Sequence, residues 1–206
     1  SITGAAGVFG GTDPGLAMRL AVSVKADVAV IEIEASGMIE FNSTNTKRLG
    51  VERKSFTLDV NGRVSLLKVL NFDAGFKVVV RDGAWRVDFN AGIDFFGLLT
   101  IDAYGFFDSG GNFDVTLEGG FRIGSSSFGL SGNAKFRVYN YVTDGADGNP
   151  HYSFGLSISA SLKARLFGIT LGGVGFNASF TASGSGRVKI ELSLTVRIKI
   201  LFVTIK

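Results

Sequence analysis

The sequence predicts an all-β fold: an elongated antiparallel β-meander, rolled or folded into a two-layer sandwich or solenoid-like stack around a Phe/Leu/Ile core. Three observations predict it. Apolar and polar residues alternate with period two over long stretches, which gives a strand one dry face and one wet face. Dipeptides suited to hairpin turns separate these stretches. Apolar residues at helical spacing are sustained nowhere in the chain.

Alternating stretches mark the expected strands in order along the chain. They are residues 16–24, 28–34 (with one slip), 85–90, 113–118, 154–166 and 188–200. In the last of them, seven aliphatic residues alternate with six polar ones, as expected for a long strand or for two strands joined by a bend. About 14–16 strands at a spacing of about 4.8 Å are expected for the whole chain.

Turn-forming residues separate the expected strands. Asn61-Gly62 and Asp82-Gly83 each supply the two positive-φ positions of a type I′ hairpin turn. Longer polar connections are expected at residues 42–54 (a loop or mobile edge), 108–112, 124–127 and 143–150. Short connections make consecutive strands neighbours, so the sheet is expected to be mostly an antiparallel meander.

Composition excludes several classes of site. The 206 residues include 29 Gly and 19 Phe but only one His and no Cys. Without cysteine there is no disulfide scaffold, thiolate zinc site or thiol catalysis, and a single histidine excludes a multi-histidine metal centre. The chain therefore carries few of the side chains on which enzymes usually rely.

Charge divides the chain into an acidic part and a basic part. Residues 1–150 carry 14 basic and 17 acidic residues, whereas residues 151–206 carry 7 and 1. The basic end suits an anionic partner, but alternation of its cations with apolar residues favours a solvated strand face that discourages edge pairing. We expect one domain with four segments: a Gly-rich N-terminal segment (1–15), an acidic meander (16–142), a polar loop (143–151) and a basic meander continuing the same sheet (152–206).

A Phe-Gly pair followed by an aliphatic residue recurs in the second half of the chain. The copies are Phe96-Gly97-Leu98, Phe128-Gly129-Leu130, Phe154-Gly155-Leu156 and Phe167-Gly168-Ile169. Their irregular spacing argues against a strict solenoid and favours a degenerate series of hairpins. Glycine at these points is expected to let a strand bend or bulge while the neighbouring Phe fills the space beneath it.

The sequence around these pairs resembles a known class of repeats. Stretches 93–99, 104–115 and 128–132 carry the patterns apolar-Phe-Gly, Asp-Ser-x-Gly-x-Phe and Phe-Gly-Leu-x-Gly. Over residues 85–203 the chain resembles the glycine- and phenylalanine-rich β-repeat regions of very large, adhesin-like bacterial surface or secreted proteins, which lie beside calcium-binding β-sandwich and cadherin-like modules. The resemblance implies an extracellular structural or adhesive role. Separately, the strand-like pattern at 201–206, where the sequence stops, is expected for a fragment of a longer chain. It implies no catalytic residues.

The residue pattern predicts no catalytic site. His151 is expected to be a solvated loop residue, and no Gly-x-Ser-x-Gly elbow lies between a strand and a helix. Acidic residues fall on the polar parity of strands, where a solvated face is simpler than a paired-carboxylate site; examples are Asp88, Asp114, Glu118 and Glu191. We therefore expect a protein that is not an enzyme.

Two groups of residues are candidates for binding. Asp144, Asp147 and Asn149 offer oxygen ligands on a Gly-rich loop, which suits Ca²⁺, although the same residue types are ordinary turn formers. No other cofactor is expected. The side chains of Tyr139, Tyr141 and Tyr152 are candidates for a surface that stacks against sugars, with packing at the edge of the core as the alternative.

These observations predict a non-catalytic structural or adhesive β-repeat module of a bacterial surface protein, located extracellularly. Its expected partners are neighbouring modules of the same polypeptide or further copies of itself. A lipid- or glycan-binding β-groove is the first alternative, and an outer-membrane β-barrel is the second, against which the scarcity of Trp and Tyr argues. No nucleic-acid partner is expected, since most aromatic residues are Phe on the dry parity.

Overall fold

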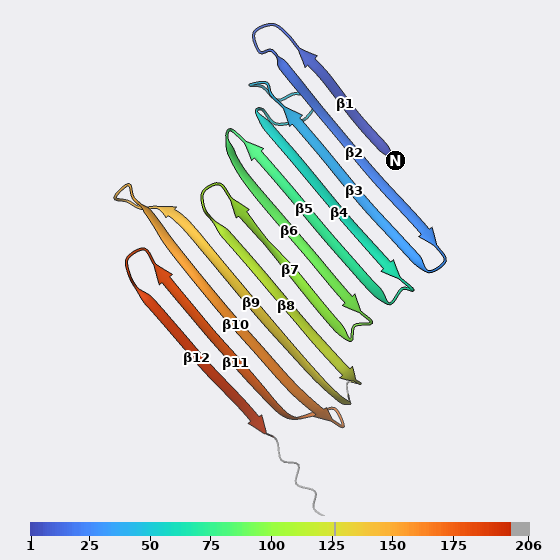
Figure 1. Ribbon diagram of the computed structural model, residues 1–206, viewed down its shortest axis with the longest axis vertical. Helices are drawn as coiled ribbons and strands as arrows, with labels where there is room; N and C mark the ends of the chain where they lie inside the picture. The colour runs from blue at the N-terminus through green and yellow to red at the C-terminus, as the bar shows by residue number, and fades with distance from the viewer. Residues whose placement is uncertain (126, 199–206) are drawn as a thin grey trace, which may run out of the picture. The chain divides into compact units, whose positions relative to one another are not determined.

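A computed structural model of the protein describes residues 1–125 and 127–198, and these residues form twelve strands in one antiparallel meander (Figure 1). The strands are β1 (Ile2–Phe9), β2 (Gly15–Val28), β3 (Ile31–Asn42), β4 (Ser55–Leu66), β5 (Leu70–Arg81), β6 (Ala84–Phe95), β7 (Leu99–Asp108), β8 (Phe113–Gly124), β9 (Phe128–Asp144), β10 (Pro150–Leu166), β11 (Ile169–Ser183) and β12 (Val188–Ile198). Their order in the sheet is their order in the chain. The predicted all-β antiparallel meander is therefore confirmed. The pattern at 199–206 lies outside the described residues.

The strands belong to two units. Unit 1 comprises Ser1–Ile93 with Ala103–Phe113, and unit 2 comprises Asp94–Asp102 with the described part of Asp114–Lys206. Strands β1–β5 lie wholly in unit 1 and β9–β12 in unit 2, whereas β6, β7 and β8 are divided between the units.

In unit 1, strand pairing gathers the apolar residues on one face. The register aligns Leu20 with Ile39, Ile39 with Leu58, and Leu58 with Val78. On one side of β2–β5, every residue is apolar or Gly, and we call this side the apolar face of unit 1. It is formed by the even-numbered residues 16–28 of β2, the odd-numbered residues 31–41 of β3, and the even-numbered residues 56–66 of β4 and 70–80 of β5. The opposite, polar face carries charges in cross-strand register.

Unit 2 has the same two-sided organisation. The apolar face of unit 2 is formed by the even-numbered residues of β9, β10 and β12 and by residues 172–182 (even) of β11. Asn140 and Asp144 are the two members of this set with an amide or carboxyl side chain, and both lie toward the C-terminal end of β9. The polar face of unit 2 carries the odd-numbered residues of β9, β10 and β12, together with residues 173–183 (odd) of β11.

The expected Phe/Leu/Ile core does not form among the described residues. The buried hydrophobic residues are Ala17 and Val51, while large apolar side chains on both apolar faces are exposed. The physical reason is the connectivity: among the described residues each strand pairs with its predecessor in the chain, and even the longer loop between β3 and β4 returns to the adjacent position in the sheet. Within each unit, the described strands therefore form one layer with one apolar face, and no second layer of the same unit covers that face.

Turn predictions are confirmed in part. Asp82 and Gly83 have φ of 49° and 84°, as a type I′ turn requires. The Asn61-Gly62 prediction is wrong, because both residues lie inside β4, where Gly62 pairs with Ala35 and Ala74. Alternation runs unbroken through this dipeptide, so pairing on both sides of β4 overrides the local turn preference.

The Phe-Gly pairs divide into two structural kinds. Phe96-Gly97 and Phe167-Gly168 are turns in which both residues have positive φ. The other two pairs lie within β9 and β10. The observed register shift falls between Ala164 and Arg165, next to the second turn. At two of the four Phe-Gly pairs, the chain therefore reverses direction in a turn, where the sequence predicted only a bend in a strand.

Candidate functional site

The apolar faces of both units expose many large hydrophobic side chains. In unit 1, the paired residues Val60 and Phe76 are 44% and 43% exposed. In unit 2, the side chains of β12 are more exposed still, with Ile190 at 74% and Leu192 at 72%. Isolated exposed apolar residues are normal, but contiguous apolar surface is typical of sites that bind another protein, a membrane or a ligand.

On β5 and β11, a small side chain of the apolar face lies between two large ones. In unit 1, Ala74 lies between Phe72 and Phe76 on β5. In unit 2, Ala178 lies between Phe176 and Phe180 on β11. Alternation of this kind forms knobs and recesses that interdigitate when two sheets pack face to face.

Tyr139 and Tyr141, two of the predicted sugar-stacking residues, lie together on the polar face of unit 2. Their ring centroids are 5.3 Å apart, and the guanidinium of Arg137 lies 4.8 Å from the centroid of the Tyr139 ring. Arg137 donates through Nε to Asp114 Oδ1 at 2.9 Å and through a second nitrogen to Oδ2, while the Tyr141 hydroxyl also donates to Asp114. Asp114 therefore holds an Arg and a Tyr in fixed positions beside a second aromatic ring.

Hydrogen bonds from Arg137, followed by that from Tyr141, hold the pKa of Asp114 below its ordinary value against the opposing effect of partial burial. A lowered folded-state pKa stabilises the fold above the unfolded pKa of about 3.9, and this contribution is lost as pH falls through the folded-state pKa.

Asp114→Asn is expected to reduce the free energy of unfolding by about 1–2 kcal/mol near pH 7, and by less below about pH 4. Denaturant titrations at both pH values measure the difference. Asp144→Asn is the control, and equal losses in the two variants would contradict the assignment.

Tyr152, the third predicted aromatic residue, lies on the other side of the sheet. It pairs with Val142 on the apolar face of unit 2 and is half exposed. Because neighbouring residues of a strand point to opposite faces, Tyr152 does not join Tyr139 and Tyr141 in one platform. The sequence alone does not predict this placement. Counting alternate residues across the five-residue loop does not tell which face Tyr152 occupies, because that depends on the register of the β9–β10 hairpin.

The predicted calcium loop connects β9 and β10. Asp147 accepts hydrogen bonds from the backbone N–H of Asn149 at 3.1 Å and from its side-chain amide at 3.2 Å, and these bonds hold the pKa of Asp147 below its ordinary value. The Nε2 atom of His151 lies 3.4 Å from Asp147 Oδ1. Asp144 ends β9 and pairs with Pro150. The described residues contain no group of three or more His, Cys, Asp or Glu side chains that could hold a metal ion.

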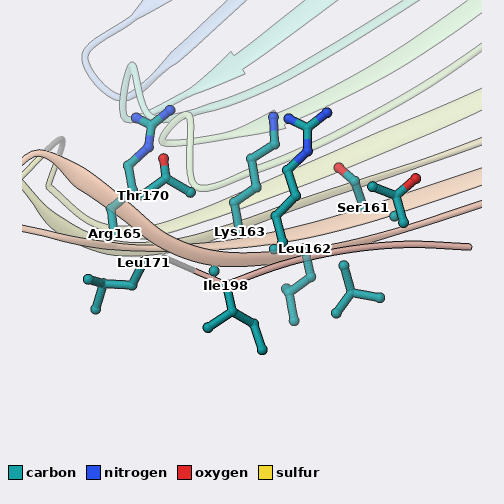
Figure 2. Close-up of a pocket in the computed structure, with 13 residues that line it drawn as sticks. Ser161, Leu162, Lys163, Arg165, Thr170, Leu171 and Ile198 are labelled. Carbon is teal, nitrogen blue, oxygen red and sulfur yellow. The ribbon is translucent and has the colours of Figure 1, made fainter. Parts of the chain in front are cut away.

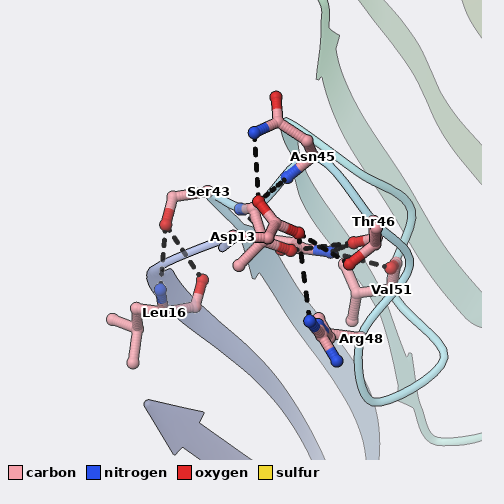
Figure 3. Close-up of polar contacts among 9 residues, drawn as sticks. Asp13, Leu16, Ser43, Asn45, Thr46, Arg48 and Val51 are labelled. Atoms are coloured by element: carbon pink, nitrogen blue, oxygen red, sulfur yellow. Dashed lines mark hydrogen bonds and ion pairs between the residues drawn. The ribbon is translucent and has the colours of Figure 1, made fainter. Parts of the chain in front are cut away.

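Loop 42–54 contains a polar network that sequence analysis did not detect. Asn42 is buried; its Oδ1 accepts from Thr44, and its Nδ2 donates to the carbonyls of Thr46 and Val51. Figure 3 shows Asp13 reaching into this loop, where it accepts from the backbone N–H of Asn45 at 2.8 Å and from the Thr46 hydroxyl at 2.7 Å. The Asn-Ser-Thr-Asn run at residues 42–45 could have indicated this network from the sequence, because such side chains form hydrogen bonds with nearby backbone groups. The network fixes the loop against β1 and β2.

A shallow, cation-lined hollow lies on the polar face of unit 2. Figure 2 shows Lys163, Arg165 and Thr170 pointing to one side of the sheet, while Leu171 and Ile198 point to the other. A second hollow shares Ser161, Lys163 and Arg165 with the first and adds Arg122. The basic end of the chain is evident from the sequence, but the position of Arg122 beside it is not, because Arg122 belongs to β8.

Among residues 1–125 and 127–198, no helix is long and apolar enough to cross a membrane. Comparisons with protein-family models, with curated proteins and with solved structures each find no significant match to the chain.

Proposed function

We propose that the chain is a non-catalytic structural β-repeat module whose apolar face is covered by a second sheet of the same kind. The observation that carries the proposal is the apolar face itself, which over β2–β5 contains no polar side chain. In a folded protein such a face is buried, because each Å² of apolar surface removed from water contributes about 25 cal/mol.

The exposed surface is large enough to require a stable partner. The chain has an accessible surface of 13638 Å². A folded monomer of 21.8 kDa is expected to have about 9,300 Å². The excess of about 4,300 Å² per chain amounts to about 8,600 Å² for two chains, which exceeds the total of about 2,000–5,000 Å² that obligate homodimer interfaces usually bury.

The alternation of large and small side chains favours a protein sheet as the covering partner. Phe72, Ala74 and Phe76 offer a knob, a recess and a knob, and face-to-face packing of a second copy fills such recesses. The resemblance to β-repeat regions of large bacterial surface proteins supports a place in an extracellular structural or adhesive region. There the neighbouring repeat would take the position of the second copy.

The test is the oligomeric state of the purified chain in solution without detergent. Analytical ultracentrifugation at micromolar concentration is expected to show a dimer or a larger assembly of defined size. Native mass spectrometry of the same sample is expected to show protein subunits alone. A monomer that exposes the apolar face and stays monodisperse would contradict the proposal.

Lipid handling is a second candidate function, favoured by one observation: the apolar face of unit 1 offers no hydrogen-bonding side chain, and acyl chains need none. Under this function, native mass spectrometry would show monomers carrying lipid of discrete mass. Extraction with organic solvent would then release fatty acyl species. Lipid-free oligomers would exclude it.

A further inference from the structure

We infer that the polar face of unit 2 holds a binding site for an anionic polysaccharide, a sugar polymer that bears sulfate or carboxylate groups. Four cations form the site: Arg122 on β8, Lys163 and Arg165 on β10, and Arg197 on β12. We call them the basic row. The inference goes beyond the structural role proposed above and requires only that the polar face stay exposed.

Strand register sets the spacing of the basic row. Lys163 pairs with Ser131 on one side and with Gly173 on the other, and Gly173 pairs with Arg197. Lys163 and Arg197 are therefore two strands apart, about 9.6 Å. Arg165 follows Lys163 on the same face at about 6.8 Å. From β8 to β12 the row covers four strand spacings, about 19 Å, which suits a polymer better than a single small anion.

The basic row lacks counter-charges within the described part of the chain. Other cations on the polar face of unit 2 form ion pairs: Lys135 with Glu118 at 2.9 Å and Lys189 with Glu191 at 2.7 Å. No ion pair to a described acidic residue is formed by the four cations of the row, and the residues lining both hollows include no Asp or Glu. Their positive potential is therefore available to an anionic ligand.

Protection of a sheet edge does not explain Lys163 and Arg165, although it suits Arg197 on β12, the last strand of the described sheet. Lysine on an edge strand discourages pairing with other chains. Lys163 and Arg165, however, lie on β10, which is paired with β9 on one side and β11 on the other. Cations on an interior strand do not protect a sheet edge. The interpretation of the basic end as a protected edge therefore does not account for Lys163 and Arg165.

The surface between the cations suits sugars. Ser131, Ser161 and Thr195 line the hollows with hydroxyl groups, while Gly173 and Gly175 leave the sheet surface free of side chains. A Cβ added at Gly173 would lie 3.0 Å from the Leu162 carbonyl oxygen and 3.5 Å from Lys163 Cγ, so glycine keeps space beside that lysine. The single aromatic residue lining the hollows, Phe121, packs against Gly132 on the apolar face. Single-stranded nucleic acid, which is bound by stacking on aromatic rings, is therefore the poorer fit.

The experiment compares dextran sulfate with uncharged dextran of equal length, using the full chain and isothermal titration calorimetry. We expect binding of dextran sulfate and of polygalacturonate, a carboxylated polymer, but not of dextran. Lys163→Gln/Arg197→Gln is expected to weaken binding of dextran sulfate at least tenfold at about 50 mM salt, and to lower the salt slope of log K by about 1.5. The matched control Lys135→Gln/Lys189→Gln removes the same net charge from the same face outside the hollows and should retain most of the affinity.

Three results would overturn the inference. Equal losses in the two double variants would show attraction by net charge alone. Equal binding of dextran and dextran sulfate would show that the cations are not used. A single-stranded DNA oligonucleotide that binds more tightly than dextran sulfate, with the same loss in the first variant, would assign the row to nucleic acid instead. Both double variants should keep the oligomeric state of the unmodified chain, so the polysaccharide site and the structural role can fail independently.

Discussion

Val60→Lys is expected to weaken self-association of the chain by about 100-fold or more, the largest effect we predict. Val60 lies in the middle of β4 on the apolar face of unit 1, where it pairs with Gly37 and Phe76. If a second copy covers this face, the substitution buries an ammonium group without a partner, which costs several kcal/mol. A loss of about 2.8 kcal/mol already corresponds to a hundredfold change in the dissociation constant. Sedimentation equilibrium over a range of concentrations measures it.

Asn61→Lys is the matched control for this prediction. Asn61 is the next residue of β4 and is also exposed, but it points to the polar face. The same charge is therefore added one residue away on the opposite side of the sheet. We expect the assembly of this variant to match that of the unmodified chain. If the two variants associate equally well, the apolar face of unit 1 is not the interface.

Gly124→Ala is expected to lower the free energy of unfolding by at least about 2 kcal/mol. Gly124 ends β8 with φ of 91°, a conformation that costs an L-residue about 1–3 kcal/mol. A Cβ at this position would also lie 2.3 Å from the carbonyl oxygen of Phe128, which accepts a hydrogen bond from the backbone N–H of Ser125. The backbone of the β8–β9 connection must therefore shift, and the substitution combines conformational strain with a steric clash.

The control separates these two causes. Gly97 has φ of 63°, and a Cβ there would meet no atom within 4 Å. Gly97→Ala is expected to cost only the conformational part, about 1 kcal/mol. Chemical denaturation at one fixed protein concentration compares the variants, because association also shifts apparent stability. Equal losses at the two positions would show that the close approach to Phe128 has no energetic weight.

Sequence alone was sufficient to predict the two-sided strands. Alternation assigns Val188, Ile190 and Leu192 to one face of β12 whatever strand lies next to it, because side-chain direction has a period of two. It was not sufficient to predict what covers that face. The same apolar parity suits a sandwich, a groove and a sheet that pairs with another copy, and the choice depends on connectivity and partners.

Local turn preferences were less informative than the alternation around them. Asn61-Gly62 has the residues of a type I′ turn, yet pairing with β3 and β5 keeps it extended. Phe96-Gly97 lacks the usual Asn or Asp at the first position, yet it forms a turn. Strand pairing over twelve residues outweighs a dipeptide preference of about 1 kcal/mol.

The candidate sites show the same division. The acidic partner of Tyr141 is Asp114, 27 residues away in the sequence, and the basic row joins Arg122 to residues more than 40 positions later. Neither grouping has a local motif, because sites on a sheet face are assembled across strands. The loop carrying Asp147 and Asn149, by contrast, was found as a polar segment because its contacts lie within a few residues.

Pairing of every strand with its predecessor in the chain has a consequence for how such a sequence changes length during evolution. Removing or duplicating one complete hairpin leaves the direction and the facing of all remaining strands intact, so the product folds by the same rules. Removing a single strand would reverse the direction of everything that follows it. Selection would therefore tolerate insertions and deletions of about 30 residues, two strands with their turns, better than those of half that size.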